Sequence, residues 1–439
     1  MVEAMANGVE DRLIDGLSFK LAPGASYITD RRSVTFHPQG SNIYTPTAGT
    51  KLIRLLLTGD SWLDPSTFRI MFDVYNNDAT ANHNLRPLAA PWAFFRRLRI
   101  LAGGQVVEDI DYYNRIHQML HTLIAKESIA NDAAEAFGYT TDDLETMTDA
   151  TKFTGIGPQQ SQTVMFKPLS GLLGQDKYLP IRYCPLTIEL ELVDDINDPI
   201  VAGVATAVGT SQPFTTANSS VTWQVQQVQV KVDMCTLDNA LDNSYAQHLL
   251  SGKALPINYN TWVSQFQAIA GSDVQLNVTR ALTRLKSVFI TLDKDFPTRG
   301  SSTVANRDLF YRRKWNDFFS PMNPDNVANN FNNNPRGEIQ IQMQIGSKLF
   351  PEYPIRSHAE AYYQLKKCLG VQASALHNFD VTGNEYRDNK FIMGFDCEKV
   401  LEAGWTGMNT RAGDLLVIKL KHAQNIPQAE VATRAADRV

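Results

Sequence analysis

Alternating apolar and polar residues are the dominant pattern along this chain, and a period of two predicts β-strands with one buried face. The clearest runs place apolar side chains on one face and amides or charges on the other, and they lie at 68–74, 186–192 and 339–345. Between 221 and 234 the alternation slips by one residue at Gln226 and Gln227, where a β-bulge would keep both apolar stripes facing the core. The chain is therefore expected to be mainly β.

The first half contains enough strands for one complete jelly-roll sandwich. Further alternating segments, at 33–37, 51–59, 96–102, 105–110 and 161–168, bring this half to about eight strands, the number in a jelly roll. The second half offers about seven. Its end, from Ala429 to Arg434, is polar and loop-like where a closing strand is needed. We expect that edge to be completed by an unrecognised strand, by residues beyond Val439 or by a neighbouring subunit.

Two short helices are predicted at similar places in the two halves. Residues 112–125 carry apolar side chains at helical spacing, and residues 357–369 open with the serine and glutamate of a capping box. Each helix follows a strand, a glycine turn and a second extended segment, the turns being Gly103-Gly104 and Gly346. Two strand ends also look alike, at 55–60 and 288–293. A duplicated architecture with slightly unequal loops is typical of this pattern.

The length of 439 residues favours two domains, because a single hydrophobic core stops growing well below that size. We expect two tandem eight-stranded jelly rolls with short helices and long loop insertions. The predicted parts are an N-terminal arm (1–16), a first jelly roll (17–237), a linker helix (238–253) and a second jelly roll (254–439). Long loops are expected at 127–160 and at about 296–336, where contacts between subunits are common.

The composition excludes some classes of function but does not identify the function. Apolar residues make up 43% and charged residues 20% of the chain, as in ordinary globular proteins. The net charge of -5 argues against direct, sequence-specific binding of nucleic acid, which draws on clustered Lys and Arg. The four cysteines have no metal-ligand or redox spacing, and no run is long and apolar enough for a signal peptide or a membrane helix. Synthesis in the cytoplasm, with reduced thiols, is expected.

Three local segments resemble the double jelly-roll major capsid proteins of Polinton-like viruses and virophages, with more distant kinship to those of large eukaryotic DNA viruses. They are Phe94 to Ile100 leading through the glycine turn to Asp111-Tyr112-Tyr113-Asn114-Arg115, then Leu169-Ser170-Gly171-Leu172-Leu173, and Tyr178 to Tyr183 running into Leu186 to Val193. The resemblance covers roughly 60–195, and it extends to the second half only by pattern. It implies a homotrimer of hexagonal outline that tiles an icosahedral shell of a double-stranded DNA virus, together with penton and minor capsid proteins.

Several residues could carry chemistry, and each has a plainer explanation. His117 and His121 have the spacing of a two-histidine metal pair, but no third ligand is evident and Gln118 stands where a metalloprotease has its glutamate. Glu189 and Glu191 share one face of a strand, as the carboxylates of a glycosidase could, yet alternation with leucines explains them equally well. Helix packing and a polar sheet face are the better explanations.

The remaining candidates are weaker still. Asp194, Asp195 and Asp198 lack the regular spacing of a calcium loop, and Gly155-Ile156-Gly157-Pro158 lacks the lysine of a phosphate-binding loop. The basic cluster Tyr311-Arg312-Arg313-Lys314-Trp315 is better explained by salt bridges and packing between subunits than by nucleic-acid binding. Arg96-Arg97 are explained by a polar strand edge or by a contact between subunits. No catalytic, cofactor or metal site is assigned.

The leading hypothesis is a structural major capsid protein of the virion rather than an enzyme. One alternative is a two-domain β-sandwich that acts on glycosides through Glu189 and Glu191. Another is a minor capsid protein or an adhesin with tandem sandwiches. The length of the chain favours the two-roll capsid protein, because a penton usually needs only one jelly roll.

Overall fold

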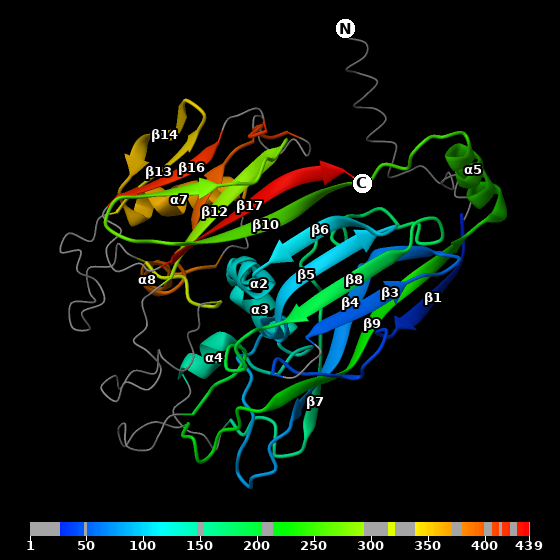
Figure 1. The fold of residues 1–439 in the computed structure, drawn as a ribbon, viewed down its shortest axis with the longest axis horizontal. Helices are drawn as coiled ribbons and strands as arrows, with labels where there is room; N and C mark the ends of the chain where they lie inside the picture. The colour runs from blue at the N-terminus through cyan, green and yellow to red at the C-terminus, as the bar shows by residue number, and fades with distance from the viewer. Residues whose placement is uncertain are drawn as a thin grey trace, which may run out of the picture.

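Four antiparallel sheets form two β-sandwiches that lie beside each other along the long axis of the molecule (Figure 1). The computed structural model describes residues 27–47, 51–146, 153–203, 214–293, 315–320, 339–370, 380–398, 406–411, 415–421 and 428–438. All strands of the first two sheets lie between Ile28 and Leu237, and all strands of the other two lie between Asn258 and Arg438.

In the first sandwich the sheets have the strand orders β1-β9-β4-β7 and β3-β8-β5-β6, and a two-residue strand β2 also pairs with β9. The strands are β1 (Ile28–Phe36), β2 (Ile43–Tyr44), β3 (Leu52–Leu57), β4 (Trp62–Asn76), β5 (Phe95–Ala102), β6 (Gln105–Asp111), β7 (Ser161–Phe166), β8 (Leu186–Leu192) and β9 (Trp223–Leu237).

In the second sandwich the orders are β10-β17-β12-β15 and β11-β16-β13-β14. The strands are β10 (Asn258–Ala268), β11 (Val274–Val278), β12 (Leu285–Leu292), β13 (Gln340–Ile345), β14 (Lys348–Ile355), β15 (Met393–Asp396), β16 (Leu416–Lys421) and β17 (Gln428–Arg438).

The two sandwiches have the same topology. If β2 is set aside, each has eight strands, and in each the first, eighth, third and sixth strands form one sheet while the second, seventh, fourth and fifth form the other. Two four-stranded sheets connected in this way make a jelly roll. The predicted mainly β, double jelly-roll fold is therefore confirmed.

The bulge predicted in the longest strand is present. Gln227 of β9 has a φ of 51°, and the pairing of β9 with β4 shifts register between Met71 and Asp73, directly opposite. The shift lets Val225 on one side of the bulge and Val228 on the other both face the core, where each is almost wholly buried.

The prediction of a loop at 429–434 is wrong. Residues 428–438 form β17, a strand with hydrogen-bonded neighbours on both sides, β10 and β12. Both faces of β17 are buried, since Glu430, Val431, Ala432 and Thr433 are all about 1% exposed. The strand therefore lacks the alternation of apolar and polar residues on which the prediction relied. Small alanines and one ion-paired glutamate fill the positions where alternation would place larger apolar residues. The second jelly roll is closed by its own last strand.

The internal repeat is confirmed in part. The glycine turns at Gly103 and Gly346 both join the fourth and fifth strands of their sandwiches, and a helix follows in each case. The similarity between 55–60 and 288–293 has no structural counterpart, because the first segment ends β3 and the second ends β12, which belong to different sheets of their sandwiches. Each segment carries core side chains at the end of a strand, which explains their similar residues.

Short helices fill the connections between strands. They are η1 (Pro91–Phe94), α2 (Tyr113–Thr122), α3 (Lys126–Asp132), α4 (Thr141–Thr146), α5 (Asn239–Leu250), α7 (His358–Cys368) and α8 (Gly383–Asp388). Ser357 caps α7 by accepting a hydrogen bond from the Glu360 amide at 3.2 Å, as predicted. The expected loop at 127–160 contains most of α3 and all of α4, and most of the one near 296–336 lies outside the described residues. None of the described helices is long and apolar enough to cross a membrane.

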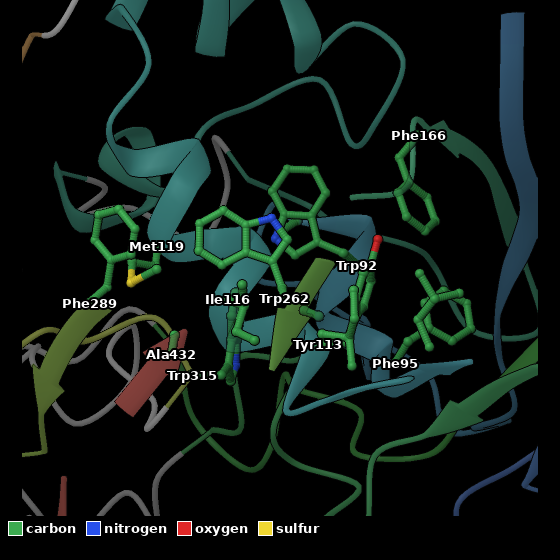
Figure 2. Close-up of a cluster of buried hydrophobic side chains, with 14 of the residues drawn as sticks. Trp92, Phe95, Tyr113, Ile116, Met119, Phe166, Trp262, Phe289, Trp315 and Ala432 are labelled. Atoms are coloured by element: carbon green, nitrogen blue, oxygen red, sulfur yellow. The ribbon is translucent and has the colours of Figure 1, made fainter. Parts of the chain in front are cut away.

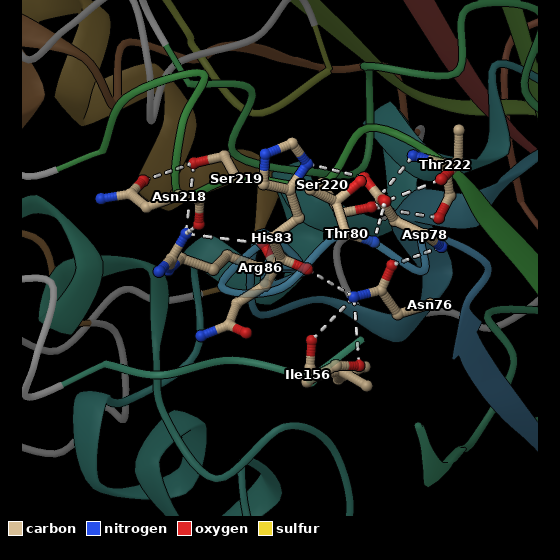
Figure 3. A network of polar contacts seen from close by, with 12 residues as sticks. Asn76, Asp78, Thr80, His83, Arg86, Ile156, Asn218, Ser219, Ser220 and Thr222 are labelled. Atoms are coloured by element: carbon tan, nitrogen blue, oxygen red, sulfur yellow. Dashed lines mark hydrogen bonds and ion pairs between the residues drawn. The ribbon is translucent and has the colours of Figure 1, made fainter. Parts of the chain in front are cut away.

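A buried polar network ties three loops together at one end of the first sandwich (Figure 3). The Asn76 side chain donates to the carbonyl oxygens of His83, Ile156 and Gly157 at 2.9–3.1 Å. Arg86, only 2% exposed, donates to the carbonyl oxygens of Phe153 and Asn218 at 3.1 and 2.8 Å. Side chains thus satisfy loop carbonyls that the strand ladders cannot reach.

The substitution Val431→Asp tests the placement of β17. A carboxylate forced into this buried strand has no partner, so we expect the loss of about 3 kcal/mol or more of unfolding free energy, or no folded protein at all. The exposed Asp437 on the same strand provides the matched control, since Asp437→Asn should change the urea midpoint little. Equal midpoints for the two variants would contradict the assignment.

Candidate functional site: the junction between the two sandwiches

The two sandwiches share a continuous apolar core. Figure 2 shows Ile116 and Met119 of α2 in one cluster of buried side chains with Trp262, Phe289 and Ala432 of the second sandwich. Every residue of β12 is buried, which happens to a strand only when both faces of its sheet are covered. One face of β12 therefore packs inside its own sandwich, and the other packs against the first.

A buried arginine crosses this junction. Arg115 of α2, with 1% of its side chain exposed, forms ion pairs with Asp293 at 2.7 Å and with Glu430 at 2.6 Å. It also donates to the Thr291 hydroxyl at 3.0 Å. The guanidinium lies 5.5 Å from the centre of the Phe266 ring and 5.1 Å from that of another aromatic residue, Phe318. All of these partners belong to the second half of the chain.

The buried ion pairs of Arg115 with Asp293 and Glu430 make the stability of each sandwich depend on the other. Burial raises the pKa of Glu430, and Arg115 opposes that rise by stabilising the charged form. A buried ion pair adds little net stability by itself, but removing one partner leaves an uncompensated charge at a large cost. The second sandwich therefore requires α2 of the first in order to bury its carboxylates.

A third buried carboxylate organises the loop 169–173. Glu108 of β6 accepts hydrogen bonds from the Ser170 hydroxyl and from the Gly171 amide, the latter at 2.8 Å. Gly171 in turn lies against β10, where a Cβ atom would come within 1.7 Å of the Asn260 carbonyl oxygen, so only glycine fits. Burial raises the pKa of Glu108 to about 7.

The rim of the junction is polar. The Tyr259 hydroxyl of β10 donates to the Val107 carbonyl oxygen at 2.8 Å, and the ring of Tyr112 packs on Phe266 with centres 4.2 Å apart. Near α3 and α4, ion pairs cross between the two halves of the chain, joining Lys126 to Glu385 at 2.8 Å and Lys390 to Asp142 at 3.3 Å. Together with the buried groups, these contacts fix one orientation between the sandwiches.

Glu189, a candidate glycosidase residue, lies in a ladder of ion pairs on the outer face of the β3-β8-β5-β6 sheet. Its carboxylate is 3.3 Å from Arg99 on β5 and 3.7 Å from Arg54 on β3. Next to them, Arg97 donates twice to Asp109 at 2.7 Å. Glu189 is therefore explained by cross-strand ion pairing on the polar face of this sheet.

Arg96, Glu191 and the three aspartates take structural positions as well. Glu191 is half-buried on the same sheet face as Glu189. Arg96 and Lys51 both pair with Asp194, the latter at 3.2 Å. The side chain of Asp195 accepts from the Asn197 amide at 2.9 Å, and the backbone carbonyl of Asp198 accepts from the indole of Trp315 at 2.9 Å. Residues 311–314 of the basic cluster lie outside the described residues.

The two candidate metal-binding histidines line a cavity of about 390 Å³ between α2, α3 and η1. His117 stacks on Trp92 with ring centres 4.1 Å apart, and His121 meets the same ring edge-on at 4.6 Å. Burial lowers the pKa of both histidines, most strongly that of His117. Among the described residues, no three His, Cys, Asp or Glu side chains are grouped to hold a metal ion.

The glycine turn at 155–157 packs against the protein itself. Gly155 has a φ of +68°, and a Cβ there would lie 2.4 Å from the Leu85 carbonyl oxygen. The backbones of Leu85 and Ile156 exchange two hydrogen bonds of 2.8 Å. The turn is thus part of the loop network of Figure 3, with the Ile156 amide engaged by Leu85.

The junction residues themselves were not predicted as a site. The sequence feature that could have indicated a buried Arg115 is its position in the predicted helix 112–125, where it lies close to the apolar positions Tyr112, Ile116 and Met119. Glu430 is a lone acid among small residues. Two of the segments that carry the family resemblance, ending in Arg115 and centred on Gly171, meet at this junction.

The sequence matches no family model and no curated protein. The structure is similar to that of PBCV-1 VP54 fitted into a reconstruction of the virophage Sputnik, with a TM-score of 0.58 and 10% identity over 96% of this chain and 97% of that one. The Faustovirus major capsid protein gives 0.56 and 8% identity, covering 97% and 94%. A chain of the PBCV-1 capsid gives 0.57 and 11%, covering 96% and 97%. At such identities the likeness establishes the fold, which is the double jelly roll over nearly the whole chain.

Removing the buried guanidinium tests the dependence between the sandwiches. Arg115→Met leaves Asp293 and Glu430 buried without their cation, and we expect the unfolding free energy to fall by about 3–5 kcal/mol. The matched control is Arg97→Met, which removes a half-exposed guanidinium from its pair with Asp109 and should cost about 1 kcal/mol or less. Urea unfolding of both variants measures the difference, and equal losses would contradict a special role for Arg115.

Glu108 should make stability depend on pH. Its pKa is about 7 in the folded chain and near the ordinary 4.5 when unfolded, so folding favours the protonated form. Its stabilising contribution is complete below about pH 4.5 and is lost as the pH rises through 7. Relative to Glu108→Gln, the native chain should therefore lose about 3 kcal/mol of unfolding free energy between pH 4.5 and 8.5. Parallel pH profiles would show that Glu108 is not responsible.

Proposed function

We propose that this chain is the major capsid protein of a double-stranded DNA virus, which assembles as a homotrimer of hexagonal outline and tiles an icosahedral shell. The observation that carries the proposal is that two jelly rolls of one topology are fixed rigidly side by side within one chain. Three such chains present six nearly equivalent sandwiches, which suit a six-sided building block. The fold shared with chains from the PBCV-1 capsid and with the Faustovirus major capsid protein supports this role.

The proposed role is structural rather than enzymatic. The protein would be made in the host cytoplasm and located in the virion, with itself as the main partner and with penton and minor capsid proteins as further partners. The net charge of -5 fits a shell that makes no sequence-specific contact with nucleic acid. The ion pairs of Glu189 with Arg54 and Arg99 weigh against the glycosidase alternative.

Molar mass in solution tests the proposal directly. Three chains of 49.0 kDa should give a particle of three times that mass, 147 kDa, by light scattering after size exclusion. Electron microscopy should show six-sided particles and, at higher concentration, sheets or shells. A stable monomer that forms neither would overturn the proposal. Glycoside hydrolysis by the purified chain that is lost in a folded Glu189→Gln variant would support the enzyme alternative.

A further inference from the structure

The cavity beside α2 is lined by both halves of the chain. Most of its wall comes from η1, α2, α3 and the segment 165–170 of the first half, and the second half contributes Asn316, Asn389 and Lys390. Its volume of about 390 Å³ lies within the range of roughly 300–1,000 Å³ that is typical of pockets for small organic molecules. A molecule bound there would contact both halves.

Much of the wall is apolar. Its larger apolar side chains include Pro91, Trp92, Ile129, Met165, Phe166 and Leu169. Trp92 and Phe166 are nearly or fully buried, and their ring centres are 6.3 Å apart. Rigid aromatic side chains hold such a wall in one shape, so an apolar molecule can enter without reorganising it. The main part of a ligand is therefore expected to be apolar.

The charged groups on the wall compensate one another. Among the described residues, three cations and three carboxylates line the cavity: Arg69, Lys167, Lys390, Asp132, Glu135 and Asp142. Arg69 lies 3.5 Å from Glu135, and Lys390 lies 3.3 Å from Asp142. A ligand with a net charge would meet no excess of the opposite charge, and the loss of its hydration would be costly. The cavity therefore favours an uncharged ligand.

His117 presents an unused hydrogen-bond donor. The buried Tyr113 hydroxyl accepts a hydrogen bond from the Leu169 amide at 2.9 Å and lies 3.1 Å from Nδ1 of His117. No other acceptor for this hydroxyl lies in the described part of the chain, so its proton is assigned to the hydrogen bond with Nδ1. Burial lowers the pKa of His117, and the N–H of the neutral ring is then at Nε2. None of the described residues accepts from it.

Gln118 presents a second unused donor. An indole can only donate, so the Trp92 N–H identifies the Gln118 atom that lies 3.1 Å away as the side-chain oxygen. The amide nitrogen is left with its two N–H groups, for which the described residues offer no acceptor. His117 and Gln118 both line the cavity. Because both unused groups are donors, the complementary group of a ligand is an acceptor.

We propose that this cavity binds an uncharged, largely apolar small molecule, a ketone, ester or amide whose carbonyl oxygen accepts hydrogen bonds from His117 and Gln118. Its apolar part lies against Trp92 and Ile129. Since the bound molecule contacts both halves of the chain, it stabilises their folded arrangement by mass action. The proposal goes beyond the capsid role and does not depend on the oligomeric state.

The uncharged naphthyl ketone prodan, whose fluorescence rises and shifts to the blue in apolar surroundings, tests the site. Titration of the full-length chain into prodan should give a saturable rise with a dissociation constant on the order of 100 µM or tighter. The naphthoate of the same size, which carries a negative charge, should bind more weakly. No saturable signal, or tighter binding of the naphthoate, would overturn the proposal.

Filling the cavity should prevent binding. Ala136 lines the cavity, and Ala136→Phe should weaken prodan binding by about tenfold or more because the new ring takes the space of the ligand. The matched control is Ala134→Phe, at an exposed position outside the cavity, which should leave the affinity unchanged. Thermal unfolding confirms that both variants are folded. Equal affinities of the two variants would contradict this site.

Removing one donor tests the predicted hydrogen bond. His117→Phe keeps an aromatic ring against Trp92 but removes the N–H, and it should weaken prodan binding about threefold to tenfold. The matched control is His121→Phe on the next turn, where Nε2 lies 3.6 Å from Asp132, and it should leave the affinity unchanged. A larger loss from His121→Phe than from His117→Phe would contradict the assigned donor.

Photolabelling locates the site in the native chain without any substitution. Benzophenone is an uncharged aromatic ketone that attaches to nearby C–H bonds when irradiated. Peptide mapping by mass spectrometry should find the label on residues that line the cavity, such as Ile129 and Met165, and excess prodan should reduce it. A label confined to other parts of the chain, or one that prodan does not reduce, would overturn the proposal.

Discussion

The salt bridges of Arg115 with Asp293 and Glu430 are the constraint on which the rest of the structure depends. Charges buried in an apolar junction tolerate very little displacement, because any gap leaves a carboxylate or a guanidinium without compensation. The apolar residues around them supply most of the favourable burial, but they would permit several sliding arrangements. The charged groups allow only one of these arrangements. Two sandwiches that could each rotate about a linker are thereby held as a single body.

The strands of the first sandwich were predictable because most of them have one buried and one polar face. β17 was not, and the reason is physical: a strand covered on both sides loses the alternation that marks a half-buried strand, and its alanines have little apolar character of their own. Burial also explains why the junction between the sandwiches was not predicted from the sequence. Arg115 and Glu430 look like surface residues in the sequence, and only the folded chain brings them together from 315 positions apart.

The residues that first attracted chemical hypotheses illustrate a related limit. Glu189 belongs to a ladder of cross-strand ion pairs, and His117 stacks on Trp92 beside a cavity. Spacing along the sequence correctly placed Glu189 on one face of a strand and the histidines on one side of a helix, but it carries no information on what lies opposite. Chemistry depends on the opposing groups. Gly171 is the contrasting case. The backbone of Asn260 lies so close to it that any residue with a Cβ atom would clash, and the glycine itself is visible in the sequence.

For the proposed capsid protein, the linker from β9 through α5 to β10 also affects how assembly depends on concentration. Because it connects the two sandwiches covalently, their contact forms at an effective concentration set by the linker and not by the number of molecules in the cell. In the proposed trimer, each chain therefore enters with its two sandwiches already joined, and the formation of a building block depends on the third power of chain concentration where six separate sandwiches would require the sixth. Two sandwiches in one chain thus lower the concentration at which the proposed assembly can begin.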